Sequence, residues 1–225
     1  MWLTLRRIFT GLLCALLLTV PVRADAGAGY VALTFDDGPS GRFTRRLLDG
    51  LQARDVKATF LLCGYRVELY PKEAACIAAE GHEIGIHGYS HDPMCDMAEA
   101  QVMSEIRKTA ALLPGDAVFL RPPGGKYNEV TIAAAEKVGL AILSWSLDPK
   151  DWAIRDAAVI MDRVVEKAKD GDVILLHDMS DSSVTAALGI IDRLEAKGFR
   201  FVTVSELAEI KGTTLEPGKV YSQFP

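Results

Sequence analysis

Short apolar runs alternate along this chain with segments whose apolar residues recur at helical spacing. Several of the runs are continuously apolar and end in polar residues, which is typical of buried parallel strands. We predict strands at Tyr30–Phe35, Ala58–Leu62, Glu83–His87, Ala117–Leu120, Leu140–Trp145, Val173–His177 and Phe201–Val204.

The segments between these runs have the period of amphipathic helices. Met97–Leu113 is the clearest case, and Asp156–Lys169 and Ser183–Lys197 follow the same pattern. The apolar stripe of the first helix is predicted to comprise Val102, Ile106, Ala110 and Leu113. Glycine is the usual residue just past a helix end. Such glycines stand at Gly81, Gly171 and Gly198.

A repeated strand-then-helix order predicts an α/β fold with a parallel sheet and helical crossovers. The 225 residues suffice for one domain with a full core, and they contain no internal repeat or low-complexity linker. The strand count favours a β/α barrel, or a barrel that lacks one strand. A doubly wound open sheet is the alternative. The tail from about Gly212 is expected to be irregular.

The N-terminal segment has the features of a signal peptide. Two arginines precede the apolar run Ile8–Val20, which is too short for a comfortable membrane span. Small residues then offer cleavage sites at Val22-x-Ala24 and Ala24-x-Ala26. We predict a signal peptide at 1–24 and a secreted or periplasmic domain at 25–225, with no permanent membrane span. An uncleaved anchor is the alternative, and lipid attachment at Cys14 is less favoured.

Export permits disulfides, and three cysteines follow the predicted cleavage site: Cys63, Cys76 and Cys95. An odd number leaves at least one of them free. No CxxC spacing occurs, so a cysteine zinc site is not expected. One buried thiol and at most one bridge are expected.

Chemistry-bearing side chains recur just past the C-terminal ends of the predicted strands, where a β/α barrel builds its active site. Segments far apart in sequence are therefore expected to meet at one mouth. These side chains are Asp36, Asp37, His87, His91, Arg121, Trp145, Asp148, Asp151, Trp152 and His177. His82 lies at the opposite end of its strand, and we expect it to be structural.

The pair His87 and His91 has a spacing that lets two imidazoles face one metal ion. Asp37 could complete a set of two histidines and one carboxylate, with open positions for water and substrate. Such a site suits zinc, and also iron(II), cobalt or nickel. The adjacent Asp36 could accept a proton from water. Taken alone, the Asp-Asp-Gly-Pro sequence also fits a polar turn.

Other residues of the predicted mouth suit proton transfer and support. His177 could donate a proton to a leaving group. Arg121 could orient a carboxylate, Asp151 could pair with an ionisable partner, and Trp152 could form an apolar wall. The formal net charge is −5, and no run of Lys and Arg indicates a nucleic-acid partner.

With these residues, the chain resembles the polysaccharide deacetylase family, the NodB-homology domain of carbohydrate esterases, over roughly residues 30–207. Five motifs in order carry the resemblance: Thr34-Phe35-Asp36-Asp37-Gly38-Pro39, His87 to His91, Arg121-Pro122-Pro123-Gly124-Gly125, Asp148-Pro149-Lys150-Asp151-Trp152 and Leu175-Leu176-His177. The resemblance implies a distorted β/α barrel of seven or eight strands.

The resemblance also implies roles for the central residues. Asp37, His87 and His91 match the ligands of one divalent metal ion, usually Zn²⁺, with Co²⁺ or Ni²⁺ as alternatives. Asp36 matches the general base and His177 the general acid.

Further roles follow from the same resemblance. Arg121 is similar to the residue that holds the base, and Asp151 to the one that tunes the acid. Leu175 and Trp152 resemble the walls of the acetyl-methyl pocket. At Gly124 the family usually has an aromatic residue, so a sugar contact is lost, but the main-chain N–H survives as an oxyanion donor. Gly88 stands where the family has Ser or Thr, which removes a hydrogen bond from the metal loop.

These features predict a monomeric, metal-dependent hydrolase that removes N-acetyl groups from glycans containing N-acetylglucosamine and releases acetate. Peptidoglycan, chitin fragments and related glycans all remain candidates, and the acidic chain favours a neutral or cationic glycan. The alternatives are an O-acetyl esterase acting on xylan, an amidase acting on small non-sugar amides, and a non-enzymatic carbohydrate-binding relative. The last is disfavoured because Asp36 and His177 are both present.

Overall fold

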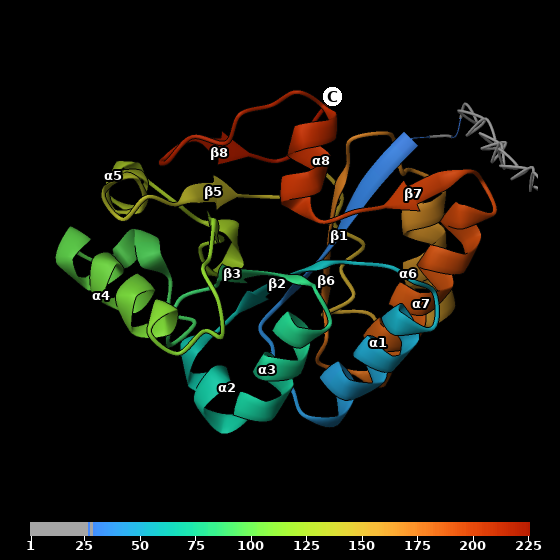
Figure 1. Ribbon diagram of the computed structural model, residues 1–225, viewed down its shortest axis with the longest axis horizontal. Helices are drawn as coiled ribbons and strands as arrows, with labels where there is room; N and C mark the ends of the chain where they lie inside the picture. The colour runs from blue at the N-terminus through green and yellow to red at the C-terminus, as the bar shows by residue number, and fades with distance from the viewer. Residues whose placement is uncertain (1–26, 28) are drawn as a thin grey trace, which may run out of the picture.

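The computed structural model describes residue 27 and residues 29–225 (Figure 1). The predicted signal peptide at 1–24 lies outside the described residues. Within the described part of the chain, no helix is both long and apolar enough to cross a membrane.

Strands and helices alternate along the chain. The strands are β1 (Gly29–Asp36), β2 (Thr59–Leu62), β3 (Glu83–Ile86), β4 (Phe119–Leu120), β5 (Ala141–Leu143), β6 (Val173–His177), β7 (Phe199–Phe201) and β8 (Val220–Tyr221). The helices are α1 (Arg42–Gln52), α2 (Gly64–Leu69), α3 (Pro71–Ala79), α4 (Glu99–Ala110), α5 (Glu129–Lys137), α6 (Ala157–Val165), α7 (Asp181–Glu195) and α8 (Val204–Ile210), with short 3₁₀ turns η1 (Met94–Asp96) and η2 (Pro123–Gly125).

The strands form one parallel sheet in the order β6-β1-β2-β3-β4-β5-β8, and β7 pairs with β1. Sequential order from β1 to β5 is that of a barrel, because a doubly wound sheet would reverse direction. The segment after β5 returns to β6 through a bridge between Leu147 and Ile174. The predicted distorted barrel is therefore confirmed.

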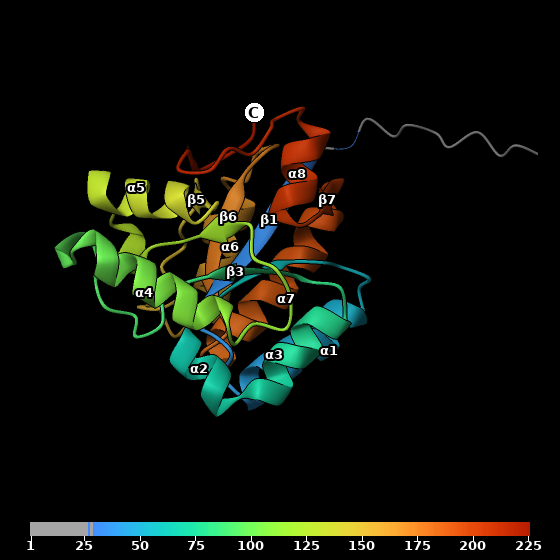
Figure 2. The same cartoon turned by 60° about the vertical axis from the view of Figure 1, so that its left-hand side comes forward.

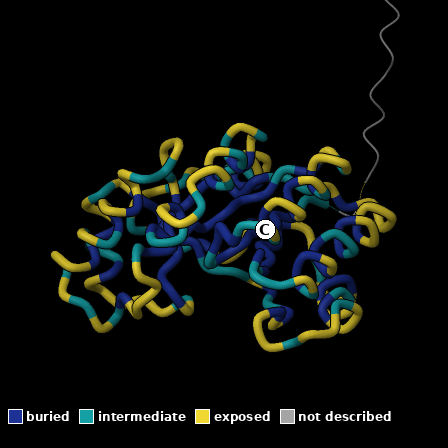
Figure 3. Tube along the Cα trace, turned by 90° about the horizontal axis from the view of Figure 1, so that it is seen from below, coloured by how far each residue is buried: buried dark blue, intermediate teal, exposed yellow. Residues whose placement is uncertain are grey.

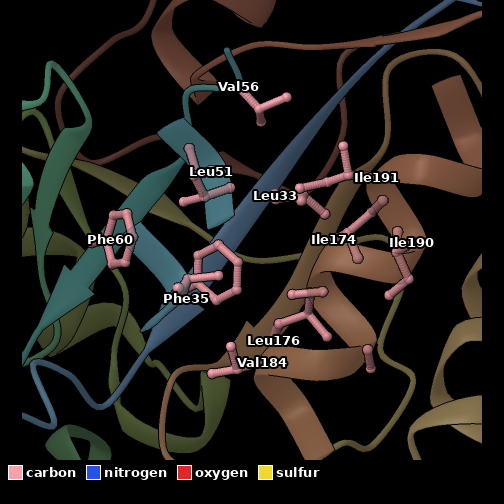
Figure 4. Packing of buried hydrophobic residues seen from close by; sticks show 14 of the residues in the cluster. Leu33, Phe35, Leu51, Val56, Phe60, Ile174, Leu176, Val184, Ile190 and Ile191 are labelled. Atoms are coloured by element: carbon pink, nitrogen blue, oxygen red, sulfur yellow. The ribbon is translucent and has the colours of Figure 1, made fainter. Parts of the chain in front are cut away.

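Helices cover the outside of the curved sheet, with two groups on opposite sides and α2 and α3 between them (Figures 1 and 2). Helices α1, α6 and α7 pack together on one side, and α4 and α5 pack together on the other. The main core lies between the first group and the sheet, where Leu33 and Phe35 of β1 and Leu176 of β6 meet Ile190 and Ile191 of α7 (Figure 4). Buried chain lies centrally, and exposed chain lies in the outer loops and turns (Figure 3).

Most predicted elements are present with shifted ends. Strand β5 is shorter than predicted, and β7 ends before Val204, which instead begins α8. Helix α4 buries Val102 and Ile106, but its next buried position is Thr109, whereas Ala110 is exposed. The stripe therefore follows the i, i+4, i+7 spacing of a helix face.

Helix α6 ends at Val165, four residues before the predicted end. The Asp172 carboxylate accepts a hydrogen bond from the Lys169 N–H at 2.7 Å, which turns the chain toward β6. Gly171, at φ +87°, therefore belongs to this connection and does not cap the helix.

The C-terminal tail is not wholly irregular as expected, because β8 adds to the edge of the sheet beside β5. Its side chains supply the reason. Tyr221 and Phe224 stack with ring centroids 5.6 Å apart, and both are buried in an apolar cluster with Val204 and Leu207 of α8. The tail therefore completes the core at this edge.

The three cysteines of the described residues are all free. Cys63 is the buried thiol, and burial raises the pKa of this thiol well above its ordinary value. The bridge that the sequence left open does not form.

His82 is a buried structural residue, as predicted. Its Nδ1 accepts the Ala58 N–H at 3.2 Å, and its ring lies edge-on to Phe60. Burial, assisted by the charge of Lys57, lowers its pKa from 6.5 to about 4. The imidazole is therefore neutral in the folded protein at neutral pH, since protonating Nδ1 would remove the acceptor that Ala58 uses.

This depressed pKa predicts a stability change in mild acid. Between pH 6.5 and 4 the unfolded chain takes up a proton at His82 and the folded protein does not, so stability falls as the pH drops. The contribution is roughly 3 kcal/mol across that window. Urea unfolding of wild type and His82→Gln at several pH values measures it. The free energy of unfolding of wild type relative to His82→Gln should fall by roughly 3 kcal/mol from pH 7 to pH 4. A constant difference would contradict the assignment.

Candidate active site

The C-terminal ends of the strands surround a cavity of about 390 Å³. It is lined by Asp36, Asp37, His87, His91, Gly124, Gly125, Trp145, Asp148, Trp152, Leu175 and His177. The other two predicted site residues, Arg121 and Asp151, lie behind these and have no exposed surface. The predicted convergence of separate motifs at one mouth is thus present in the structure.

Strand register brings two of these residues side by side. Asp36 is the last residue of β1 and His177 the last of β6, and they are direct partners across the parallel ladder. β1 is buried from Val31 to Asp36 and β6 from Val173 to Leu176, and this burial fixes the register. A carboxylate and an imidazole from positions far apart in sequence therefore flank the same cavity.

A buried guanidinium holds Asp36 in place. Arg121 Nη1 donates to Asp36 Oδ1 at 2.7 Å and to Thr34 Oγ1 at 2.8 Å. Its Nη2 and Nε donate to the carbonyl oxygens of Ser144 and Leu143, at 2.8 and 3.2 Å. These bonds tie the ends of β1, β4 and β5 to one side chain.

Three potential ligand atoms, from Asp37, His87 and His91, lie within 4.8 Å of one another. Asp37 Oδ1 is 3.0 Å from His91 Nε2 and 3.3 Å from His87 Nε2. Asp37 and His91 both have left-handed backbones, at φ +70° and +65°. Such conformations cost energy for residues other than glycine and concentrate at functional sites.

The protonation pattern of this cluster suits a cation. His87 Nδ1 lies 2.7 Å from the Arg121 carbonyl oxygen, which can only accept, so Nδ1 carries the proton and the Nε2 lone pair faces Asp37. The buried Asp37 Oδ1 has no hydrogen-bond donor among the described residues. A divalent ion fits this set of lone pairs.

Asp151 contacts His177 at two points. Its Oδ2 accepts the His177 main-chain N–H, and its Oδ1 lies at the same distance, 2.8 Å, from the ring Nδ1. Burial lowers the pKa of His177, but the hydrogen bond and charge of Asp151 raise it to about 9. This pairing directs Nε2 into the cavity, 3.9 Å from Asp37 Oδ2.

The walls of the cavity are mainly apolar. Leu175 is almost fully buried, whereas Trp152 is 59% exposed at the rim. The ring of Trp145 packs so closely on Gly125 that a Cβ there would lie 2.4 Å from it. No atom lies within 4 Å of where a Cβ of Gly124 would be, so that side of the cavity is open.

Asp178 is a supporting residue that the sequence did not single out. It has no exposed surface, and its carboxylate accepts a hydrogen bond from Thr44. Ser40 donates to its main-chain oxygen, and a Cβ at Gly38 would lie 2.5 Å from its Oδ1. Burial raises its pKa to about 6. Asp178 thus fastens the loop that carries the two cavity carboxylates, and its position next to His177 was the available signal.

Comparisons with known proteins identify one family. The family model for polysaccharide deacetylase matches residues 23–143. A peptidoglycan-N-acetylglucosamine deacetylase of Bacillus cereus is 37% identical over 189 residues, which cover 80% of this chain and 89% of that one. The peptidoglycan-N-acetylglucosamine deacetylase PgdA of Listeria monocytogenes is 35% identical over 85% of this chain. That match spans only 41% of the length of PgdA.

A solved structure is similar over nearly its whole length. The family 4 acetyl xylan esterase from Clostridium thermocellum, in complex with a cobalt ion, superposes with a TM-score of 0.81 at 32% identity. The match covers 87% of this chain and 99% of that one. On the family match, the relatives and this fold, the chain belongs to the polysaccharide deacetylase family.

Proposed function

We propose that this protein is a metal-dependent deacetylase that removes N-acetyl groups from glycans containing N-acetylglucosamine. The observation that carries the proposal is the geometry of the cavity. A buried carboxylate, Asp36, and an oriented imidazole, His177, flank the same three-residue cluster of potential metal ligands. The peptidoglycan-N-acetylglucosamine deacetylases among the relatives support this substrate class.

Asp37, His87 and His91 would hold the metal ion. Once bound there, a divalent cation would polarise the acetyl carbonyl and lower the pKa of a water molecule. Two imidazoles and one carboxylate suit Zn²⁺, and Co²⁺ or Ni²⁺ also fit this ligand set. The cobalt ion in the esterase structure supports a divalent ion.

The chain's own residues provide the proton transfers. Asp36 accepts a proton from the attacking water, and the Arg121 guanidinium keeps its other oxygen engaged and its orientation fixed. His177, held through Nδ1 by Asp151, presents Nε2 to the leaving nitrogen and donates the proton that an amine needs to depart. Leu175 and Trp152 shelter the acetyl methyl group, and the main-chain N–H of Gly124 is the assigned oxyanion donor.

An O-acetyl esterase is the second candidate. The same residues would hydrolyse an acetyl ester, and the similarity to an acetyl xylan esterase favours this alternative. The open side of the cavity at Gly124 is compatible with an N-acetylglucosamine glycan and with acetylated xylan.

We also propose that residues 1–24 direct export and are removed, so that residues 25–225 act at the cell envelope or outside the cell. The charged start, apolar run and small-residue sites support this. The exported protein would then begin at Asp25 or Gly27, whereas retained Met1 would indicate an anchor.

The proposed function is tested by measuring acetate release from a panel of substrates. Chitooligosaccharides and peptidoglycan should release acetate, and acetylxylan should release less. The Asp36→Asn variant is the control for background hydrolysis. Release from acetylxylan alone would replace the proposal with the esterase, and release from none of the glycans would overturn both.

Asp36→Asn should remove the proton acceptor and leave the ligand residues in place. We expect the deacetylation rate to fall by about 10²–10⁴, the usual contribution of general acid–base catalysis, with metal content unchanged. Because Asp36 also pairs with Arg121, circular dichroism must show a native fold. A wild-type rate in the folded variant would end the assigned role.

His177→Ala should show a loss that depends on the leaving group. An amine must be protonated to leave, whereas a phenolate leaves without a proton, so the rate should fall more for N-acetyl substrates than for activated aryl acetates. Comparing kcat/KM on both substrates measures this difference within one variant, which cancels any change in the amount of folded enzyme. Equal losses on both would contradict the assignment of His177 as the acid.

A further inference from the structure

The segment Gly88–Ser90 links the two imidazoles of the candidate metal site, and most of its main-chain groups are engaged. The carbonyl oxygens of Gly88 and Tyr89 accept hydrogen bonds from the N–H groups of Gly64 and Tyr65, in the first turn of α2, at 3.0 and 3.1 Å. One side of this segment is therefore held by a neighbouring helix.

The other side is held by one carboxylate. Glu105 Oε2, from the middle of α4, accepts the Tyr89 N–H at 2.9 Å and the Ser90 N–H at 2.8 Å. It also accepts the Ser90 hydroxyl at 2.9 Å. Hydrogen bonds to an ionised acceptor are roughly twice as strong as those between neutral groups. The loop Gly88–Ser90 is thus held by three charge-assisted hydrogen bonds to the side chain of a residue 14 positions after His91 in the sequence.

The backbone of this segment needs such support. Gly88 has φ +78° and His91 φ +65°, and for a histidine the left-handed conformation costs energy. A Cβ at position 88 would lie 3.1 Å from Met94 Cε, so glycine fits here.

We propose that Glu105 is a positioning residue that pre-sets His91 relative to His87 and Asp37, and so sets the affinity of the site for its metal ion. Glu105 acts through this segment, because its Oε2 accepts its hydrogen bonds from Tyr89 and Ser90, which lie between the two histidines. Removing groups that orient metal ligands typically lowers metal affinity by about 10–100-fold. The inference rests on the proposed metal site.

The test is a metal titration of the folded protein that comprises residues 25–225. Zn²⁺ and Co²⁺ affinities of wild type, Glu105→Ala and Glu105→Gln are measured by competition with a chromophoric chelator. Glu105→Ala should bind about 10–100-fold more weakly, and Glu105→Gln, which keeps a neutral acceptor, should lose less. With saturating Co²⁺ the visible spectrum and kcat of the variants should approach those of wild type, because no ligand has been removed.

A matched control residue, Glu68 of α2, contacts a side chain of the same segment. Glu68 accepts a hydrogen bond from the Tyr89 hydroxyl at 2.8 Å but touches none of the loop main chain, so Glu68→Gln should keep wild-type affinity. If Glu105→Ala folds poorly, Glu105→Gln carries the comparison. Wild-type affinity in a folded Glu105 variant would overturn the inference and leave the proposed function intact. Failure of wild type to bind either metal would overturn the metal site itself.

Discussion

A guanidinium with no exposed surface is the centre on which this site depends. Burying an isolated charge is prohibitive, so Arg121 must be surrounded by acceptors, and the ends of β1 and β5 supply them. Removing one partner of such a buried pair costs roughly 3–5 kcal/mol. The same residue also offers its carbonyl oxygen to His87. The position of Asp36 and the tautomer of His87 therefore follow from one buried residue, through its side chain and its main-chain carbonyl respectively.

The two residues to which we assign proton transfer, Asp36 and His177, are each held by a buried partner of opposite charge. Asp36 is held by a cation, Arg121, which fixes its orientation, whereas His177 is held by an anion, Asp151, which raises the pKa of His177. The parallel register of β1 and β6 then places the acceptor and the donor next to each other at the mouth. The sheet positions the pair, and the two buried counter-charges set their electrostatics.

Much of this arrangement follows from the sequence, because continuous apolar runs mark the buried strands and polar motifs mark their C-terminal ends. The strands that carry Asp36 and His177 were predicted almost to the residue. Features that depend on tertiary contacts were not: the tail strand β8 forms because Tyr221 and Phe224 find an apolar cluster. Glu105 looks like any glutamate on a half-exposed helix face until the fold brings it to the loop before His91.

Elemental analysis tests whether Asp37, His87 and His91 together hold a divalent ion. Protein purified without added chelator is compared with His91→Ala and with a His87→Ala, His91→Ala double variant, each checked for native circular dichroism. This ligand set predicts one ion for each wild-type chain, a reduced content in the single variant and none in the double variant. Full metal content in the folded double variant, or full acetate release by wild type after its metal is stripped, would contradict it.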